Sequence, residues 1–276
     1  MIRPSLDAPL NLLHGWIFAI PLMTILLCHE FGHYLLARRH RVEVSPPYFI
    51  PFPNLIGTMG AFISIRSPLH NRRMLLDIGA AGPLAGFIPS VIALAFGFYF
   101  STISPMVTDK IVLVFGDSLL ILALQYLIIG PIPEGFAVWI HPVGLAGWVG
   151  LFVTMLNLLP IGQLDGGHVA YALVGHRQWW VGPIALAGLI VLGLVVSPWW
   201  WMLLGFLVVV FLIVVIAVRI LYGVKVPLST LWKGKILRHP AIPDEEPLDP
   251  RRRFIGWLCL AIFVLCFIPL PIQVLN

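Results

Sequence analysis

Long apolar runs, separated by short polar or basic stretches, dominate the pattern of residues along the chain. A helix needs about 20 predominantly apolar residues to cross the hydrocarbon core of a bilayer. The runs of that length predict spanning helices at about 14–38, 74–100, 144–164, 180–198, 200–223 and 254–272. The pattern therefore predicts an all-α polytopic membrane protein with about six transmembrane helices.

A further apolar run, at about 111–129, decides the orientation of everything that follows it. With six spans, all but Arg3 and Lys110 of the 17 Lys and Arg residues lie on one side, as the positive-inside rule expects of a cytoplasmic face. Counting 111–129 as a span would place the basic loop 224–253 outside. We therefore assign 102–143 to an insertion on the outer face, with 111–129 interfacial or re-entrant and both termini outside.

The segment 40–73 is too apolar for a solvated loop and too rich in Pro and Gly for a spanning helix. Two short β-type runs, Tyr48–Phe52 and Ala61–Ile65, flank the stretch Gly57–Gly60, a pattern typical of a hairpin. Non-helical backbone at membrane depth is tolerated only against protein or a wet cavity. We therefore expect a membrane re-entrant, β-hairpin-like loop beside the first helix.

The composition agrees with a membrane protein and argues against other classes. Hydrophobic residues make up 59% of the 276 residues and charged residues 11%. The net charge of +5 is distributed beside apolar runs, which argues against nucleic acid as a partner. Cys28, Cys259 and Cys266 lie within apolar runs and match neither a disulfide framework nor a thiolate zinc site. The N-terminal segment lacks the pattern of a removed signal peptide, so we expect the first span to insert directly.

The first apolar run contains the sequence HEFGH. His29 and His33 are four residues apart, so a helix places both imidazoles on one face, with Glu30 beside them. Zinc suits two neutral imidazoles, one further protein ligand and an open position for water. Zinc lowers the pKa of that water, and a glutamate can accept its proton. Ionisable groups are costly inside a membrane and usually functional there, which favours a Zn2+ site over a pair of interfacial histidines.

Asp165, in the sequence LDGG, is the candidate third ligand. It lies at the cytoplasmic end of the 144–164 span, at a depth that can match the histidines. Pro160 disturbs the helix because it has no backbone N–H, and the neighbouring glycines permit unwound backbone. Because Arg38 marks the interface and a helix rises about 1.5 Å per residue, the histidines lie roughly 7 and 13 Å below it.

The motifs His29–His33 and Asn157–Gly166 resemble those of the site-2 protease family of intramembrane zinc metalloproteases. That family carries HExxH on one core helix and an Asn…Pro…Leu-Asp-Gly motif on the third. The Gly57–Gly60 turn and the Gly79–Gly86 stretch also match, so the resemblance covers about 20–175. No PDZ-sized insertion fits within 102–143, and the chain is most similar to PDZ-less members, including bacterial and chloroplast forms.

The resemblance implies roles for the matching positions. His29, His33 and Asp165 would bind zinc, with Glu30 as the general base. Asn157 would donate to the substrate carbonyl or the developing oxyanion, although an interhelical hydrogen bond is the alternative. The hairpin around Gly57, Gly60 and Ala61 would offer a strand edge to an unwound substrate, or plug the site. The resemblance also implies substrates that are single-pass transmembrane proteins in the lipid bilayer.

We divide the chain into a metalloprotease core at 1–175 and three additional helices at 176–276. The predicted function is hydrolysis of a peptide bond within or near a transmembrane segment, on the cytoplasmic side of a prokaryotic plasma membrane or, as the alternative, a chloroplast membrane. A metal transporter is one rival, but transporters tend to show internal repeats and none is evident here. A catalytically inactive membrane scaffold is the other, and it would have no need of Glu30.

Overall fold

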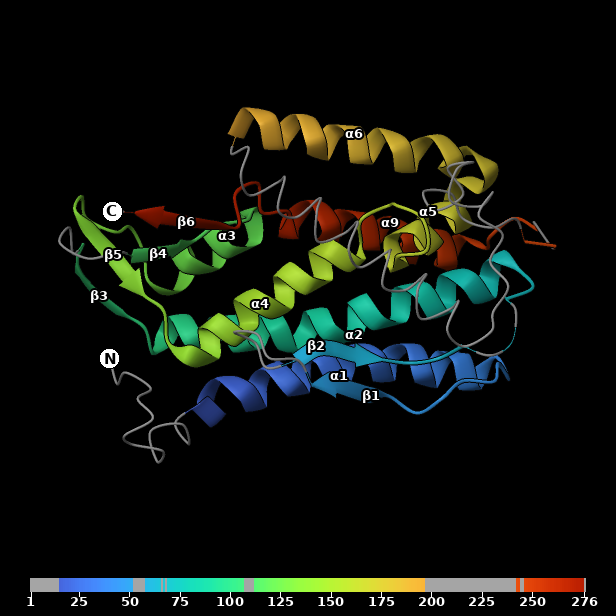
Figure 1. Cartoon of the computed structure of the whole chain (residues 1–276), viewed down its shortest axis with the longest axis horizontal. Helices are drawn as coiled ribbons and strands as arrows, with labels where there is room; N and C mark the ends of the chain where they lie inside the picture. The colour runs from blue at the N-terminus through green and yellow to red at the C-terminus, as the bar shows by residue number, and fades with distance from the viewer. Residues whose placement is uncertain are drawn as a thin grey trace.

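The computed structural model describes residues 15–51, 58–65, 67, 69–106, 112–196, 242–243 and 246–275. It is mostly helical, and Figure 1 shows the long helices running side by side along the longest axis. The helices are α1 (Trp16–Arg39), α2 (Arg72–Tyr99), α3 (Leu119–Ile128), α4 (Pro142–Asn157), α5 (Asp165–Val174), α6 (Gln178–Val196) and α9 (Pro250–Cys266), with a short 3-10 turn, Gly175–Arg177.

Three helical stretches of the described chain are long and apolar enough to cross a membrane: Trp16–Arg39, Arg72–Tyr99 and Asp165–Val196. Their outward surfaces carry exposed large apolar side chains, such as Ile88 and Ile92 on α2 and Val195 on α6. The prediction of a largely helical membrane protein is confirmed. The predicted span at 200–223 lies outside the described residues, and the spans at 144–164 and 254–272 correspond to the shorter helices α4 and α9.

Helices α1, α2 and α4 form the centre of the bundle. Leu22 of α1, Leu75 and Leu94 of α2, and Leu151 of α4 are completely buried in one apolar cluster. Helices α2 and α4 approach closely at Gly97, where an added Cβ would lie 1.9 Å from the Cα of Gly144. Small residues at such a crossing let two backbones pack without intervening side chains.

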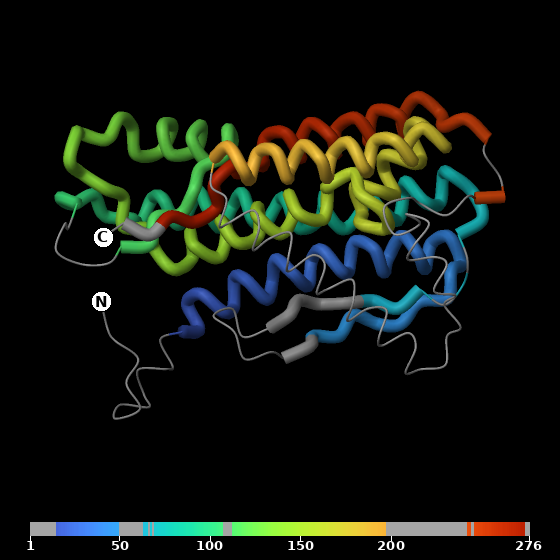
Figure 2. Tube along the Cα trace, turned by 45° about the horizontal axis from the view of Figure 1, so that its top comes forward, coloured from blue at the N-terminus to red at the C-terminus, as the bar shows by residue number. Residues whose placement is uncertain are grey.

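The predicted hairpin segment contains two antiparallel strands, β1 (Tyr48–Pro51) and β2 (Thr58–Phe62), paired with Tyr48 opposite Phe62. Both strands lie alongside α1 in Figures 1 and 2, and β2 contacts that helix. The sequence placed Gly60 in the turn, but the structure places it within β2, because pairing begins at Thr58. Gly57 lies outside the described residues.

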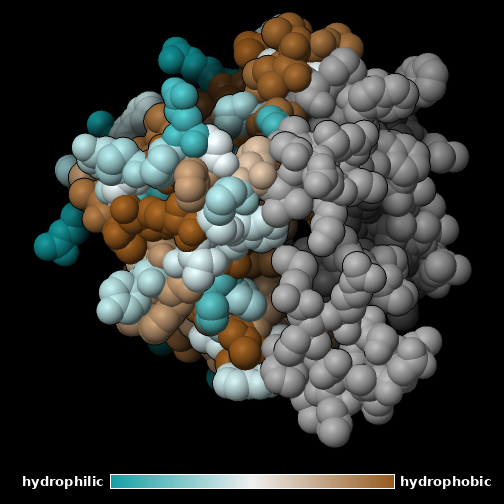
Figure 3. All heavy atoms as spheres, turned by 90° about the vertical axis from the view of Figure 1, so that its left-hand side faces the viewer, coloured by the Kyte–Doolittle hydropathy of each residue, from teal (hydrophilic) through white to brown (hydrophobic). Residues whose placement is uncertain are grey.

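Short strands and α3 form one end of the molecule. Strand β3 (Thr102–Pro105) pairs with β5 (Phe136–Trp139), and β4 (Val112–Phe115) pairs with the C-terminal β6 (Ile272–Leu275). Figure 3 shows hydrophilic and hydrophobic side chains interspersed on the described part of this end. The described part of the run at 111–129 contains β4 and the ten-residue helix α3, which is too short to cross a bilayer.

Candidate metal centre

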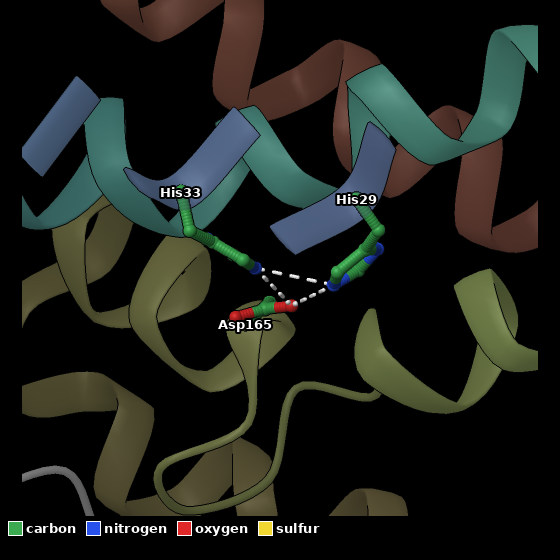
Figure 4. Close-up of side chains that lie close together, drawn as sticks. All are labelled: His29, His33 and Asp165. Carbon is green, nitrogen blue, oxygen red and sulfur yellow. Dashed lines mark hydrogen bonds and ion pairs between the residues drawn. The ribbon is translucent and has the colours of Figure 1, made fainter. Parts of the chain in front are cut away.

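Helix α1 supplies the two histidines of the HEFGH sequence. Because they are four residues apart, both imidazoles point to the same side of the helix. His29 and His33 are only 5% and 7% exposed, and their Nε2 atoms lie 3.1 Å apart. Figure 4 shows both rings directed at Asp165. Burial of two facing imidazoles inside an apolar helix is costly unless another group satisfies them.

Asp165 reaches the histidines from the first residue of α5. The sequence predicted a span through 164 with its end disturbed at Pro160; in the structure α4 ends earlier, at Asn157, and an irregular loop follows. Pro160 cannot donate a helical hydrogen bond, and Gly162 has a positive φ of 55°. An added Cβ at Gly166 would lie 2.0 Å from the Leu158 carbonyl oxygen. The glycine after Asp165 therefore lets the loop fold back against the start of α5.

The three candidate ligand atoms form a nearly equilateral triangle. Asp165 Oδ2 lies 3.3 Å from His29 Nε2 and 3.2 Å from His33 Nε2, close to the separation of the two nitrogens. Ligands about 2.0–2.1 Å from a tetrahedral zinc lie roughly 3.3–3.4 Å apart. Two imidazoles and one carboxylate are also a zinc-type donor set, with a fourth position left for water. The residues present therefore fit a zinc ion.

Helix α2 orients His33 from the side opposite the triangle. The Nδ1 atom of His33 lies 2.7 Å from the carbonyl oxygen of Ile78. Because a carbonyl can only accept, Nδ1 carries the proton and Nε2 keeps its lone pair for a metal. An added Cβ at Gly82 would lie 2.0 Å from His33 Nε2, and one at Gly86 would lie 3.1 Å from His29 Cβ. The sequence analysis did not identify the Ile78 carbonyl as a partner of His33. It also did not identify Gly82 and Gly86 as the residues that let α2 approach the two histidines.

Glu30 and Asn157 lie beside the triangle without belonging to it. Glu30 follows His29 on α1, is partly buried, and its carboxylate accepts a hydrogen bond from the backbone amide of Ile63. Ile63 directly follows β2, so the hairpin reaches the carboxylate next to the ligands. The Nδ2 atom of Asn157 lies 3.3 Å from His29 Nε2. A carboxylate and an amide donor thus border the same three atoms.

An apolar helix bundle that encloses two histidines, an aspartate and an adjacent glutamate has the architecture and donor set of a membrane-embedded metallopeptidase. The profile of Peptidase family M50 matches residues 17–196, a range that contains every residue of the metal centre. The chain belongs to this family, which confirms the resemblance drawn from its motifs.

Two curated relatives of the chain are plant proteins. The chain is similar to "Probable zinc metalloprotease EGY1, chloroplastic" of Arabidopsis thaliana, with 36% identity over 72% of this chain and 36% of that protein. It is 38% identical to "Probable zinc metalloprotease EGY2, chloroplastic" of Oryza sativa subsp. indica, over 58% of this chain and 29% of that protein. The chain therefore spans about a third of the length of these relatives.

Proposed function

We propose that the chain is an intramembrane zinc metalloprotease that hydrolyses a peptide bond within or near a transmembrane segment of a membrane protein. The observation that carries this proposal is the triangle of His29, His33 and Asp165, with Glu30 on the same helical turn, inside a bundle of apolar helices. The names of these two relatives, each named as a probable zinc metalloprotease, support it.

Each residue of the centre has a proposed role. His29, His33 and Asp165 hold the zinc ion. Zinc, when bound, lowers the pKa of a coordinated water and polarises the carbonyl to be attacked. Glu30 accepts the proton that this water loses and then delivers it to the leaving amine. The Asn157 amide donates a hydrogen bond to the carbonyl oxygen as negative charge develops on it, a contribution of roughly 3–4 kcal/mol when the donor is well placed.

The hairpin is the proposed substrate-binding element, and single-pass transmembrane proteins are the proposed partners. A helical substrate hides its peptide bonds, so cleavage needs an extended segment. Residues Gly60 and Ala61 of β2 lie just before Ile63, whose amide contacts Glu30. An unwound substrate that adds to this two-stranded sheet would place its backbone beside the catalytic carboxylate. Gly57 would contribute to the same loop.

The proposed topology has six spans, a re-entrant hairpin and both termini outside. In Figure 1 the end of α1 and the starts of α2 and α9 lie at the same end of the bundle. These helix ends carry Arg38 and Arg39, Arg72, and Arg252, respectively. Such clustering is typical of a cytoplasmic face, which supports an active site toward the cytoplasm. The comparisons give a prokaryotic plasma membrane no support, since these relatives are named chloroplastic.

The decisive experiment uses purified protein in detergent with zinc and a panel of single-pass membrane proteins, with cleavage sites located by mass spectrometry. Glu30→Gln should lower the cleavage rate by at least about 100-fold while keeping its zinc. Glu43→Gln is the matched control, because Glu43 is an exposed residue of another segment. Cuts that lie outside transmembrane segments, or that persist in Glu30→Gln, would contradict the proposal.

The same variants separate the two rival functions. A metal transporter would move zinc into sealed vesicles, and Glu30→Gln would not abolish that flux. An inactive scaffold would bind transmembrane segments without cleaving them in either the wild type or the variant. Neither rival explains why an ionisable carboxylate stands next to the three candidate ligands within an apolar helix.

A further inference from the structure

One carboxylate joins three helices near the basic end of the bundle. Asp77 of α2 has a side chain that is only 12% exposed. Its Oδ2 atom lies 2.8 Å from Nε2 of His40, the residue that caps the end of α1. Both oxygens accept from Arg252 of α9, at 2.8 Å from Nε and 2.7 Å from Nη2. Such bidentate pairing fixes the orientation of the guanidinium as well as its position.

A second carboxylate, at the start of α9, also binds the Arg252 guanidinium. Asp249, the residue that caps the start of α9, accepts from the Arg252 backbone amide at 3.1 Å and from Nη1 at 2.6 Å. The Arg252 guanidinium holds the pKa of the Asp249 carboxyl below its usual value, so Asp249 is charged at neutral pH. Arg252 therefore has a single well-defined arrangement between the two carboxylates.

Asp77 directly precedes Ile78, whose carbonyl oxygen holds His33. Two consecutive residues of α2 thus hold two histidines that lie two helical turns apart along α1. Ile78 contacts His33, and Asp77 contacts His40 at the end of the helix. A shift of this part of α2 would move the Ile78 carbonyl relative to the His33 ring. Such partners of metal ligands fix the ring orientation and its basicity, and their loss typically weakens metal binding by about 10–100-fold.

Helix α9 lies outside the region 17–196 that matches the family, yet it packs against both α2 and α5. Beyond the Arg252 contact with α2, it contacts α5, where Gly256 lies against Leu173 and Cys259 is completely buried. Helix α5 begins with Asp165. The same helix therefore braces the segment that orients His33 and the helix that carries the third ligand.

We propose that Arg252 is a positioning residue for the metal centre: its ion pair with Asp77 holds the Ile78 carbonyl of α2 against the His33 ring. This inference rests on the proposed zinc site. A purely stabilising ion pair would behave differently, because its loss would lower the unfolding temperature without changing the geometry around a bound metal. Arg252 touches neither ligands nor substrate, and it acts through α2.

The test compares Arg252→Gln with Arg251→Gln, which removes the same charge from an exposed neighbour at the start of α9. Zinc affinity is measured by competition with a chelator, and the visible absorption spectrum of Co2+ reports the ligand geometry. Arg252→Gln should bind zinc about tenfold more weakly than wild type and show an altered Co2+ spectrum. Arg251→Gln should match wild type in both measurements. Arg252→Lys, which keeps the charge but not the fork, should be intermediate.

These measurements separate the positioning role of Arg252 from a purely stabilising role and from the proposed protease activity. An Arg252→Gln protein with a lower unfolding temperature but the affinity and Co2+ spectrum of wild type would overturn the positioning role. If that variant does not fold, Asp77→Asn/Arg252→Gln removes the pair without leaving the Asp77 carboxylate buried and without its guanidinium, and the same readouts apply. A wild type that binds zinc but cleaves nothing would refute the proposed protease and leave this inference standing. A wild type that binds no zinc would refute both.

Discussion

The imidazole of His33 has almost no free space on the side that faces α2. A methyl group at Gly82 would lie 2.0 Å from Nε2, the nitrogen that belongs to the ligand triangle. Gly82→Ala should therefore displace the ring and lower zinc affinity by at least about tenfold, within the range for disturbed partners of a metal ligand. Zinc content after dialysis and the cleavage rate both measure the effect.

Two other glycine substitutions serve as references for Gly82→Ala. Gly188 lies in α6 with no atom within 4 Å of an added Cβ, so Gly188→Ala should keep wild-type zinc content. Gly86→Ala meets His29 Cβ at 3.1 Å, a milder contact, and should have an intermediate effect. Full zinc occupancy in Gly82→Ala would show that α2 can shift to accommodate the methyl group. The close approach of α2 at Gly82 would then not determine the position of the His33 ring.

Sequence reasoning located His29, Glu30 and His33 because spacing along one helix is a local property, and it located Asp165 by the LDGG sequence. The structure brings these residues of α1 and α5 together. The partners that orient them are different in kind. The Ile78 carbonyl belongs to the backbone, so the identity of the residue does not indicate that it is the partner of His33. The ion pair of Asp77 with Arg252 joins residues 175 positions apart, and neither side chain has a motif that would indicate the other.

At the scale of elements, α1 ends in an uncommon way. Arg41 has a φ of 57°, and the amide of Val42 donates to the Ala37 carbonyl at 2.9 Å. This is a Schellman motif in which glycine is the usual residue. Arg41→Gly should therefore raise the free energy of unfolding by about 0.5–1 kcal/mol, since the left-handed conformation costs a residue with a Cβ roughly 1–2 kcal/mol.

Arg38→Gly is the opposite control, because Arg38 is helical and in the last turn of α1. It removes the same charge from the same end, but it should lower the free energy of unfolding by about 1 kcal/mol. Denaturant unfolding in detergent measures both values. Equal effects of the two substitutions would mean that charge, rather than backbone conformation, dominates at this end of the helix.

Apolar runs predicted α1 and α2 to within a few residues, but they did not predict where helices are interrupted. The run 144–164 stays apolar through the loop between α4 and α5, so hydropathy alone extends the helix past Asn157. The last run was similarly extended to 272, whereas α9 ends at Cys266 and β6 pairs with β4. Pro160, Pro269 and Pro271 mark these breaks better than the apolar pattern does.

At the scale of the whole molecule, the metal centre joins parts of the chain that are far apart in sequence. Helix α1 supplies two ligands and α5 the third, α2 orients one ring, and α9 braces both α2 and α5. A bound zinc therefore cross-links the first and the fifth helices of the described chain. Any ligand that binds only the folded state stabilises it according to its affinity and concentration.

Zinc should consequently raise the thermal stability of the protein, and only substitution of a zinc ligand should remove this increase. At a free zinc concentration about 100 times its Kd, the folded state gains about 2.7 kcal/mol. Glu30→Gln should keep this gain, because Glu30 lies outside the triangle, whereas Asp165→Asn should lose most of it. Mg2+ should have little effect, since it prefers oxygen ligands to imidazole.

The measurement is thermal unfolding in detergent after chelation and after zinc is restored. Equal stabilisation of wild type and Asp165→Asn would place the zinc elsewhere, whereas loss in both Glu30→Gln and Asp165→Asn would make Glu30 a ligand rather than a base.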